Sequence, residues 1–328
     1  MLQYLIILLD DASTSYCHYN NSNKERRLIG LDDLRQGIFF AMKENLMIQF
    51  IYPDYELPKE YKEAVNTIDH SDIVPSSCAD KELTGRADVI VINAWDELPA
   101  CSLDDDKAYV LRTSKADFFE QYKSIVPVVG KMKRLNVVIT DVETFTDDDF
   151  NAYKDILKAL SDDIERLYEE GKSPQLNILT DRMMLDKMNN CNAGCENITL
   201  APDGKFYVCP AFYLTDDDDN YGLGKTKYDI GSLTDGLKIR NPQLYKLAYA
   251  PICRHCDAYQ CKRCVWLNRK TTYEINTPSH EQCVVSHLER NAGRELLSNI
   301  RKQGTFLPGK EIKEIEYLDP YELKDEWK

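Results

Sequence analysis

The stretch that most constrains this chain is "CRHCDAYQCKRC", from Cys253 to Cys264, in which four residues separate two CxxC pairs. Two cysteines with two residues between them let one tight turn present both sulfurs to a single metal centre. Zinc ribbons hold such pairs about 15–20 residues apart, whereas dense runs of cysteine are typical of ferredoxin ligation. The spacing therefore predicts a metal-binding segment that is closer to an iron–sulfur site than to a zinc ribbon.

The distribution of cysteines divides the chain into a cysteine-poor front half and a cysteine-dense back half. Of eleven cysteines, three are scattered along the front: Cys17, Cys78 and Cys101. The other eight lie within residues 191–283: Cys191, Cys195, Cys209, Cys253, Cys256, Cys261, Cys264 and Cys283. A closed metal site commonly takes four thiolates, which suit zinc or iron–sulfur groups. The eight clustered cysteines therefore predict two closed metal sites in the back half of the chain.

These thiols are expected to be reduced rather than paired as disulfides. The longest early apolar run, Tyr4–Leu9, has no basic residue before it and is followed by Asp10. It is too short for a transmembrane helix and lacks the flanks of a signal peptide. We therefore expect a cytoplasmic protein, a compartment in which disulfides are rare.

Length and charge bound the domain number and the partners. A chain of 328 residues favours two domains, and 43% hydrophobic residues are enough for a core. The 41 Lys and Arg against 55 Asp and Glu give a net charge of −14. This balance argues against nucleic acid or an anionic membrane as the main partner.

The front half alternates short apolar runs with polar or helical stretches. Runs rich in Ile and Val predict six strands: Tyr4–Leu9, Met47–Tyr52, Asp88–Asn93, Ala108–Leu111, Val137–Thr140 and Leu176–Leu179. Nearly continuous apolar strands indicate a mostly parallel sheet covered on both faces. A helix is predicted from Phe150 to Leu167, with its cap at Thr146–Asp149 and its end at Gly171. The fold class predicted is α/β, with six β/α units in an open or partial barrel.

A β-hairpin is predicted within the cysteine-dense half. Apolar residues alternate at Ile198 and Leu200 and again at Phe206 and Val208, around a turn that contains Gly204. The second strand would lead directly into Cys209.

The back half resembles the SPASM domain of radical SAM peptide-modifying enzymes. The likeness rests on "CNAGCENITLAPDGKFYVC", on "CRHCDAYQCKRC" and on the later Cys283. The resemblance implies two auxiliary 4Fe–4S clusters and a SPASM domain over residues 186–303. By order along the chain, it implies one cluster at Cys191, Cys195, Cys209 and Cys264. It implies the second at Cys253, Cys256, Cys261 and Cys283.

The front half, residues 1–185, resembles a radical SAM partial barrel that lacks the radical SAM motif. The family carries CxxxCxxC after its first strand, and the matching positions here are Asp10, Thr14 and Cys17. It carries Gly-Gly-Glu after the second strand, where this chain has "YPDYE". A single cysteine does not supply the three thiolates that a SAM-binding cluster needs. The resemblance therefore implies a degenerate barrel with no SAM bound and no SAM cleavage.

This combination is similar to the CXXX repeat peptide maturases. The resemblance implies an iron–sulfur partner of a true radical SAM enzyme, which acts on a small cysteine-rich peptide of ribosomal origin by electron relay or peptide presentation. Two other functions stay open. One is a zinc-stapled scaffold without redox activity. The other is an autonomous enzyme that uses carboxylates at the strand ends: Asp10, Asp11, Asp141, Glu143 and Asp181.

Several residues near the cysteines have two possible roles. His255 and His280 are expected at the surface or beside the sites rather than as ligands, and Trp266 and Tyr259 are expected to pack over the clusters. The basic residues are either solvated charge or charges that offset the clusters: Arg254, Lys262, Arg263, Arg269 and Lys270. The C-terminal segment 304–328 ends in an acidic stretch, Glu311–Lys328, which is either a docking strip or a surface helix.

Overall fold

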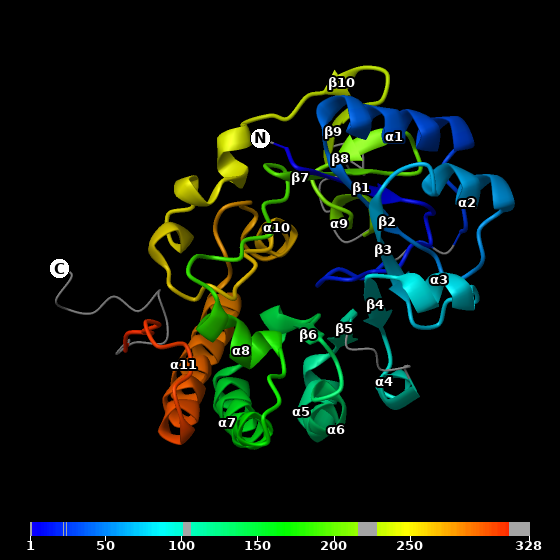
Figure 1. Cartoon of the computed structure of the whole chain (residues 1–328). Helices are drawn as coiled ribbons and strands as arrows, with labels where there is room; N and C mark the ends of the chain where they lie inside the picture. The colour runs from blue at the N-terminus through cyan, green and yellow to red at the C-terminus, as the bar shows by residue number, and fades with distance from the viewer. Residues whose placement is uncertain (1, 22, 24, 101–105, 216–227, 315–328) are drawn as a thin grey trace. The chain divides into compact units, whose positions relative to one another are not determined.

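A computed structural model describes residues 2–21, 23, 25–100, 106–215 and 228–314 of the chain (Figure 1). The chain forms two compact units, each assembled from separate segments. The first unit comprises residues 1–93, 192–250 and 265–276, and the second comprises 94–191, 251–264 and 277–328. The cysteine-dense back half thus contributes to both units. The division into residues 1–185, 186–303 and 304–328 stays a prediction about the sequence.

The first unit is built on a sheet whose described strands run in the order β10-β9-β8-β7-β1-β2-β3-β4. The strands are β1 Tyr4–Leu8, β2 Met47–Ile51, β3 His70–Pro75, β4 Val89–Ile92, β7 Asn197–Leu200, β8 Lys205–Tyr207, β9 Asp229–Ser232 and β10 Gly236–Leu237. Pairing from β7 through β1 to β4 is parallel, and pairing from β7 to β10 is antiparallel. The central β1 is almost wholly apolar, because both its faces are covered.

The helices of the first unit follow its strands along the chain. They are α1 Leu31–Glu44, α2 Lys59–Val65, α3 Lys81–Arg86, α9 Ala211–Leu214 and α10 Val265–Thr272, with the 3₁₀ turns η4 Pro242–Tyr245 and η5 Leu247–Tyr249. Helix α1 buries Leu34, Ile38 and Ala41 at steps of three and four. It ends at Asn45, whose left-handed conformation (φ 55°) caps the helix.

The second unit contains a parallel strand pair, β5 and β6, and the two longest helices. Its elements are α4 Glu97–Ala100, β5 Ala108–Thr113, α5 Lys115–Gln121, η1 Tyr122–Ile125, α6 Val126–Val129, β6 Arg134–Ile139, η2 Val142–Thr144, α7 Asp147–Glu169, α8 Asn177–Met184, η6 Cys253–His255 and α11 His280–Gln303. Helix α11 packs against α7 and α8. A Cβ at Gly293 would lie 2.8 Å from the Leu179 carbonyl oxygen, so only glycine permits this close approach of α11 to α8.

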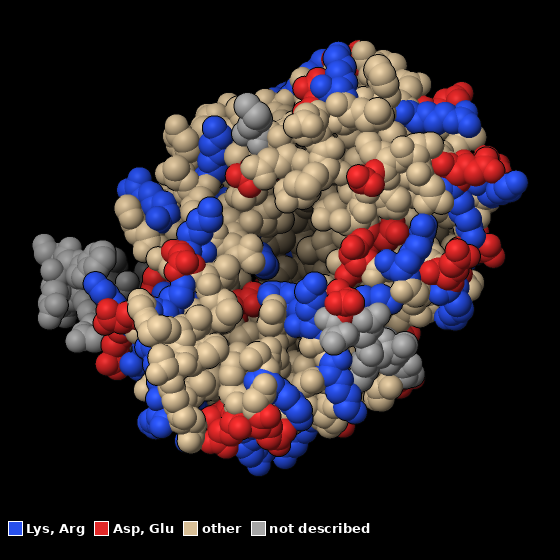
Figure 2. Space-filling view, viewed as in Figure 1, with Lys and Arg blue, Asp and Glu red and all other residues tan. Residues whose placement is uncertain are grey.

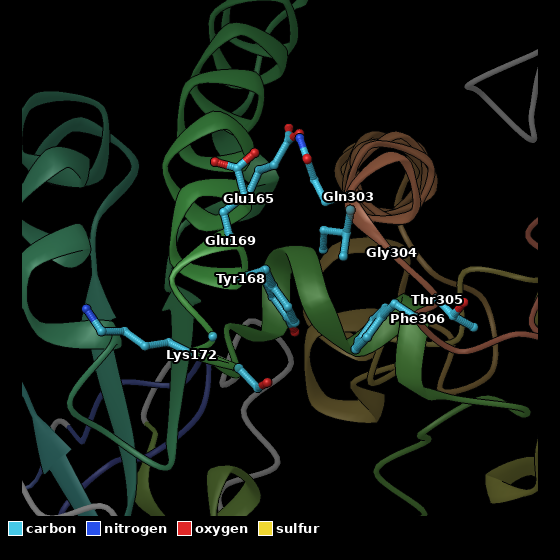
Figure 3. Close-up of a pocket in the computed structure, with 11 residues that line it drawn as sticks. Glu165, Tyr168, Glu169, Lys172, Gln303, Gly304, Thr305 and Phe306 are labelled. Carbon is cyan, nitrogen blue, oxygen red and sulfur yellow. The ribbon is translucent and has the colours of Figure 1, made fainter.

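The ends of α7 and α11 border a shallow cavity of about 230 Å³ (Figure 3). The ring of Phe306 meets the ring of Tyr168 edge to face, with 5.2 Å between the ring centres. Glu165 and Glu169 line the rim of this cavity on the α7 side. The cavity contains no cysteine and lies outside the candidate metal centre described below.

The predicted strands are partly confirmed and partly wrong. The runs at Tyr4–Leu9, Met47–Tyr52 and Asp88–Asn93 contain β1, β2 and β4, and the runs at Ala108–Leu111 and Val137–Thr140 contain parts of β5 and β6. The run Leu176–Leu179 is not a strand, because Leu176 makes a single bridge to Leu135 and helix α8 then begins at Asn177. Strand β3 was missed, since the first three residues of His70–Pro75 are polar and the last is a proline.

The predicted helix and hairpin are confirmed. Helix α7 begins with a capping box, in which the side chains of Thr146 and Asp149 each accept a bond from the other residue's backbone amide. Strands β7 and β8 pair across a turn in which Gly204 has a φ of +75°. That backbone conformation favours glycine.

The described helices include none that is long and apolar enough to cross a membrane. On the face shown in Figure 2, Lys and Arg side chains are interspersed with Asp and Glu rather than gathered into one basic patch.

Candidate metal centre

Four cysteines of the second unit line one cavity of about 290 Å³. They are Cys253, Cys256, Cys261 and Cys283, the set that the sequence resemblance assigns to the second cluster. The first three come from the "CRHCDAYQC" segment, and Cys283 comes from the first turns of α11. The Ser279 side chain caps α11, and the positive end of a helix favours a thiolate. Residues distant in sequence thus converge on one cavity.

The backbone of the ligand segment donates to two of these sulfurs. The amide of Ala258 lies 3.4 Å from Cys256 Sγ, and the amide of Arg263 lies 3.4 Å from Cys261 Sγ. Each donor stands two residues after its cysteine, so the two turns repeat one local geometry. Hydrogen bonds to ligand sulfurs tune the potential of iron–sulfur sites.

The protein holds these thiols in an environment that opposes their ionisation. Burial, with the neighbouring Cys261 and Cys256, raises the pKa of Cys253 to about 12. Burial likewise raises the pKa of Cys256 to about 11 and raises that of Cys261. A bound cation reverses this preference for the protonated thiol, because a coordinated thiol is deprotonated. The donor set therefore fits a cationic group held by thiolates.

Buried charge fixes the ligand segment to the helices. Asp257, next to Cys256, accepts from Arg290 of α11, with Nη2 to Oδ2 at 2.7 Å and Nε to Oδ1 at 3.2 Å. Arg290 is fully buried. Arg182 of α8 lies 3.5 Å from the same Asp257 carboxylate and stacks on Tyr259. The helices thus position the cysteines through Asp257, independently of any bound group.

A second polar chain lies behind Cys261. The Gln260 amide donates to the Ser286 carbonyl at 2.6 Å, and the Tyr153 hydroxyl donates to Glu289 at 2.9 Å. Gln260 also lies 3.4 Å from the Glu289 carboxylate. Burial raises the pKa of Glu289 to about 7.

The basic residues near the cysteines divide between the two roles that the sequence left open. Arg254 and Lys262 are exposed, but Arg263 is fully buried and lines the cysteine cavity, so it is not part of a surface patch. Arg269 and Lys270 belong to α10 of the first unit. Neither Tyr259 nor Trp266 lines this cavity, and their packing over the clusters stays a prediction.

The two histidines lie where the sequence placed them, at the surface or beside the site. His255 is exposed and lines the cavity, and the His280 side chain is 42% exposed and lies beside Phe150. Sequence reasoning missed His287, whose Nε2 lies 3.5 Å from Cys256 Sγ. The spacing of four residues between Cys283 and His287 on one helix was the available signal, since such residues share a helix face.

Among the described residues, no three His, Cys, Asp or Glu side chains surround one common ion position. A four-thiolate zinc site needs every sulfur about 2.3 Å from one ion. In a 4Fe–4S site, each thiolate binds a different corner of a larger group. Four thiols that line one cavity supply the number of ligands that either arrangement needs.

The other four cysteines are divided between the units. Cys195 and Cys209 lie in the first unit, and Cys191 and Cys264 lie in the second. In the first unit, the Tyr245 ring packs on Gly194. Burial and the nearby Cys209 raise the pKa of the Tyr245 hydroxyl. In the second, the amide of Cys191 donates to the Lys262 carbonyl at 2.9 Å. Their assembly into one cluster stays a prediction.

The loop after β1 has no thiol at two of the three positions compared with CxxxCxxC. Asp10 is fully buried and accepts from the Tyr55 hydroxyl at 2.7 Å and from the Ala12 amide at 2.6 Å. Tyr55 comes from "YPDYE", so the two loops compared with the family's SAM-binding loops bond to each other. The amide of Thr14 donates to the Tyr52 carbonyl at 2.9 Å, and Cys17 is partly buried.

The strand-end carboxylates of both units have partners. Asp11 lies 3.0 Å from Arg27 and accepts from the Tyr213 hydroxyl. In the second unit, Asp181 pairs with Arg134, and Asp141 accepts from the Lys115 amide at 2.7 Å. Glu143 lies in the 3₁₀ turn η2. These bonds hold the carboxylates of Asp11, Asp141 and Asp181 in place.

No family model matches the sequence, and a search of curated proteins gives no significant match. Solved structures are similar in fold. Native anSMEcpe with bound AdoMet and Cp18Cys peptide has a TM-score of 0.58 at 12% identity, over 92% of this chain and 100% of that chain. A polyhistidine-tagged form of anSMEcpe with bound AdoMet has a TM-score of 0.59 at 12% identity, over 92% of this chain and 96% of that chain.

The likeness shows a mixed α/β fold with a large parallel sheet, similar to that of anSMEcpe. The predicted fold class is confirmed. The narrower resemblance to the CXXX repeat peptide maturases stays a prediction.

Proposed function

We propose that this protein is a cytoplasmic iron–sulfur partner in the maturation of a ribosomally made, cysteine-rich peptide, acting with a separate radical SAM enzyme. The cavity lined by Cys253, Cys256, Cys261 and Cys283 carries the proposal. These thiolates would hold one 4Fe–4S group, and Cys191, Cys195, Cys209 and Cys264 would hold another. When bound, such groups supply outer-sphere electron transfer.

The chain's own residues support this role. Asp257, Arg290 and Arg182 hold the ligand segment on the helices before any group binds. The amides of Ala258 and Arg263 are aimed at two of the sulfurs. A site closed by four thiolates leaves no iron open to substrate, which favours relay over direct catalysis.

The peptide and the missing SAM chemistry are supported separately. A structure with the same fold carries AdoMet and a peptide, and we extend the peptide, but not the AdoMet, to this chain. At the loop compared with CxxxCxxC, Asp10 is bonded to Tyr55, and Thr14 replaces a second thiol.

Anaerobic purification with analysis of iron, sulfide and zinc tests the metal. We expect about eight irons and eight sulfides per chain, four of each for every four-thiolate site. About two zincs per chain without iron would instead indicate the zinc-stapled scaffold. Release of 5′-deoxyadenosine by the isolated protein would contradict the absence of SAM cleavage.

Reconstitution with the partner enzyme tests the role. We expect a stable complex and modification of a Cys-x-x-x repeat peptide only when this protein is present. Arg254→Glu and Lys262→Glu alter exposed charges near the cavity and should weaken the complex most at low salt. Full modification by the enzyme alone would remove the partner role.

A further inference from the structure

Arg263 combines complete burial with a position beside the cysteines. Its exposed fraction is 0%, and it lines the cavity that contains Cys253, Cys256, Cys261 and Cys283. Arginine keeps its proton throughout the physiological pH range. The protein therefore holds a permanent positive charge at the wall of this cavity.

The local backbone and one side-chain bond keep Arg263 in place. Its φ of +45° is a left-handed conformation that residues other than glycine adopt rarely. Its amide donates to Cys261 Sγ at 3.4 Å, and its Nε donates to Asn190 Oδ1 at 3.1 Å. The same residue thus directs a backbone dipole at one sulfur and brings its charge to the cavity.

The burial of Arg263 sets how strongly its charge acts on the cavity that it lines. Water screens exposed charges strongly, whereas a charge held in a protein interior acts over the same distance with much less loss. Arg254 and Lys262 are exposed and should act weakly on the cavity.

We propose that Arg263 sets the redox potential of the iron–sulfur group at Cys253, Cys256, Cys261 and Cys283, by favouring the reduced state. This inference rests on the proposed function. Reduction adds one electron, taken from the mediator in a titration, and so adds one negative charge to the cavity. Arg263 stabilises that charge without gaining or losing a proton. Its presence therefore raises the potential.

The test is a redox titration of reconstituted Arg263→Gln, followed by electron paramagnetic resonance. We expect the equilibrium to move at least about tenfold toward the oxidised state, which is about 59 mV for one electron. The signal that persists in a Cys209→Ala background identifies the group in the cavity. Arg263→Lys keeps the charge and should restore most of the potential. Arg254→Gln and Lys262→Gln are exposed controls that should change it little.

A second variant covers the case in which Arg263→Gln fails to take up iron. Asn190→Asp leaves Arg263 in place but sets a carboxylate beside its Nε, so the potential should fall relative to Asn190→Ala. Equal potentials for these two variants, or an unchanged potential in a fully loaded Arg263→Gln, would overturn this inference alone. Wild-type protein that takes up no iron under reconstitution would instead overturn the proposed function.

Discussion

Buried polar groups have different partners in two regions of the molecule. These regions are the cysteine cavity of the second unit and the loop after β1 in the first unit. In the loop, Asp10 accepts bonds from Tyr55 and from the Ala12 amide. In the cavity, backbone amides donate weak hydrogen bonds to the sulfurs of Cys256 and Cys261. Burial raises the pKa of both thiols.

This difference separates a structural polar network from a binding site. Groups that already have partners gain little when a ligand arrives, since each new bond replaces an old one. Buried thiols with raised pKa values favour the protonated form even beside Arg263, and a bound metal would displace those protons. The loop after β1 is therefore a structural polar network, and the cysteine cavity is a candidate site for a cationic group.

The largest expected effect separates the two regions directly. Cys261→Ala should lose the whole group at the cavity, so that iron falls from about eight to about four per chain. It should also destabilise the second unit, because metal binding contributes folding free energy in loop-rich sites. Iron analysis and thermal unfolding measure both effects.

Cys17→Ala is the matched control in the loop. Of the three positions compared with CxxxCxxC, only position 17 carries a cysteine. We expect the Cys17→Ala variant to keep its iron. Loss of iron in Cys17→Ala equal to that in Cys261→Ala would remove the distinction between the regions.

Sequence patterns predicted the parts of this molecule that depend on local chemistry. The apolar runs gave five of the described strands, and the residues around Thr146 gave the start of α7. The period of Leu176, Leu179 and Met183, at steps of three and four, fits the helix that was mistaken for a strand. Strand β3 depends on its neighbours β2 and β4 more than on its own residues.

Within the candidate site, the sequence pointed only to the thiols. The family resemblance grouped the four cysteines that line the cavity, whereas spacing alone indicated only the two CxxC pairs. Asp257, Arg182 and Arg290 were not identified, since three separate segments meet only in the folded chain. Burial of Arg263 was likewise invisible, because neighbouring basic residues in the same segment are exposed.

The next effect tests whether the cavity is preformed. Asp257→Asn leaves Arg290 buried without its ion pair, and we expect a loss of roughly 3 kcal/mol in the free energy of unfolding. The metal-free protein should show the loss as well, since the pair does not involve the metal. Urea unfolding of loaded and metal-free protein measures it.

Asp54→Asn provides the control for that ion pair. Asp54 pairs with Arg26 at 3.2 Å, and both side chains are more than half exposed. We expect a change within about 0.5 kcal/mol. A loss confined to loaded Asp257→Asn would show that the metal, rather than the helices, orders the ligand segment.

A smaller effect concerns Glu289, behind the cavity. Its pKa in the folded state is about 7, above the ordinary value near 4.5, so the folded state binds more protons between these pH values. This contribution to stability is fully present below pH 4.5 and is lost as pH rises through about 7. Its full size is at most about 3 kcal/mol.

Glu289→Gln isolates that contribution, because glutamine does not titrate and keeps a group that accepts from Tyr153. The difference in unfolding free energy between wild type and variant should change by roughly 2 kcal/mol from pH 5 to pH 8, with the variant favoured at pH 8. A difference that stays constant over this range would assign Glu289 an ordinary pKa.

The smallest expected effect comes from the most direct attempt to make the loop resemble the cavity. The double variant Asp10→Cys with Thr14→Cys completes CxxxCxxC with Cys17, yet we expect no additional iron and no SAM binding. The loop stays attached to β2, because the Ser13 hydroxyl donates to the Ile51 carbonyl at 2.9 Å and the Thr14 amide to the Tyr52 carbonyl at 2.9 Å. Loss of the Asp10 acceptor for Tyr55 should cost about 1 kcal/mol. Iron analysis and calorimetry with SAM measure the result, and about four extra irons would show that thiols alone make a cluster site here.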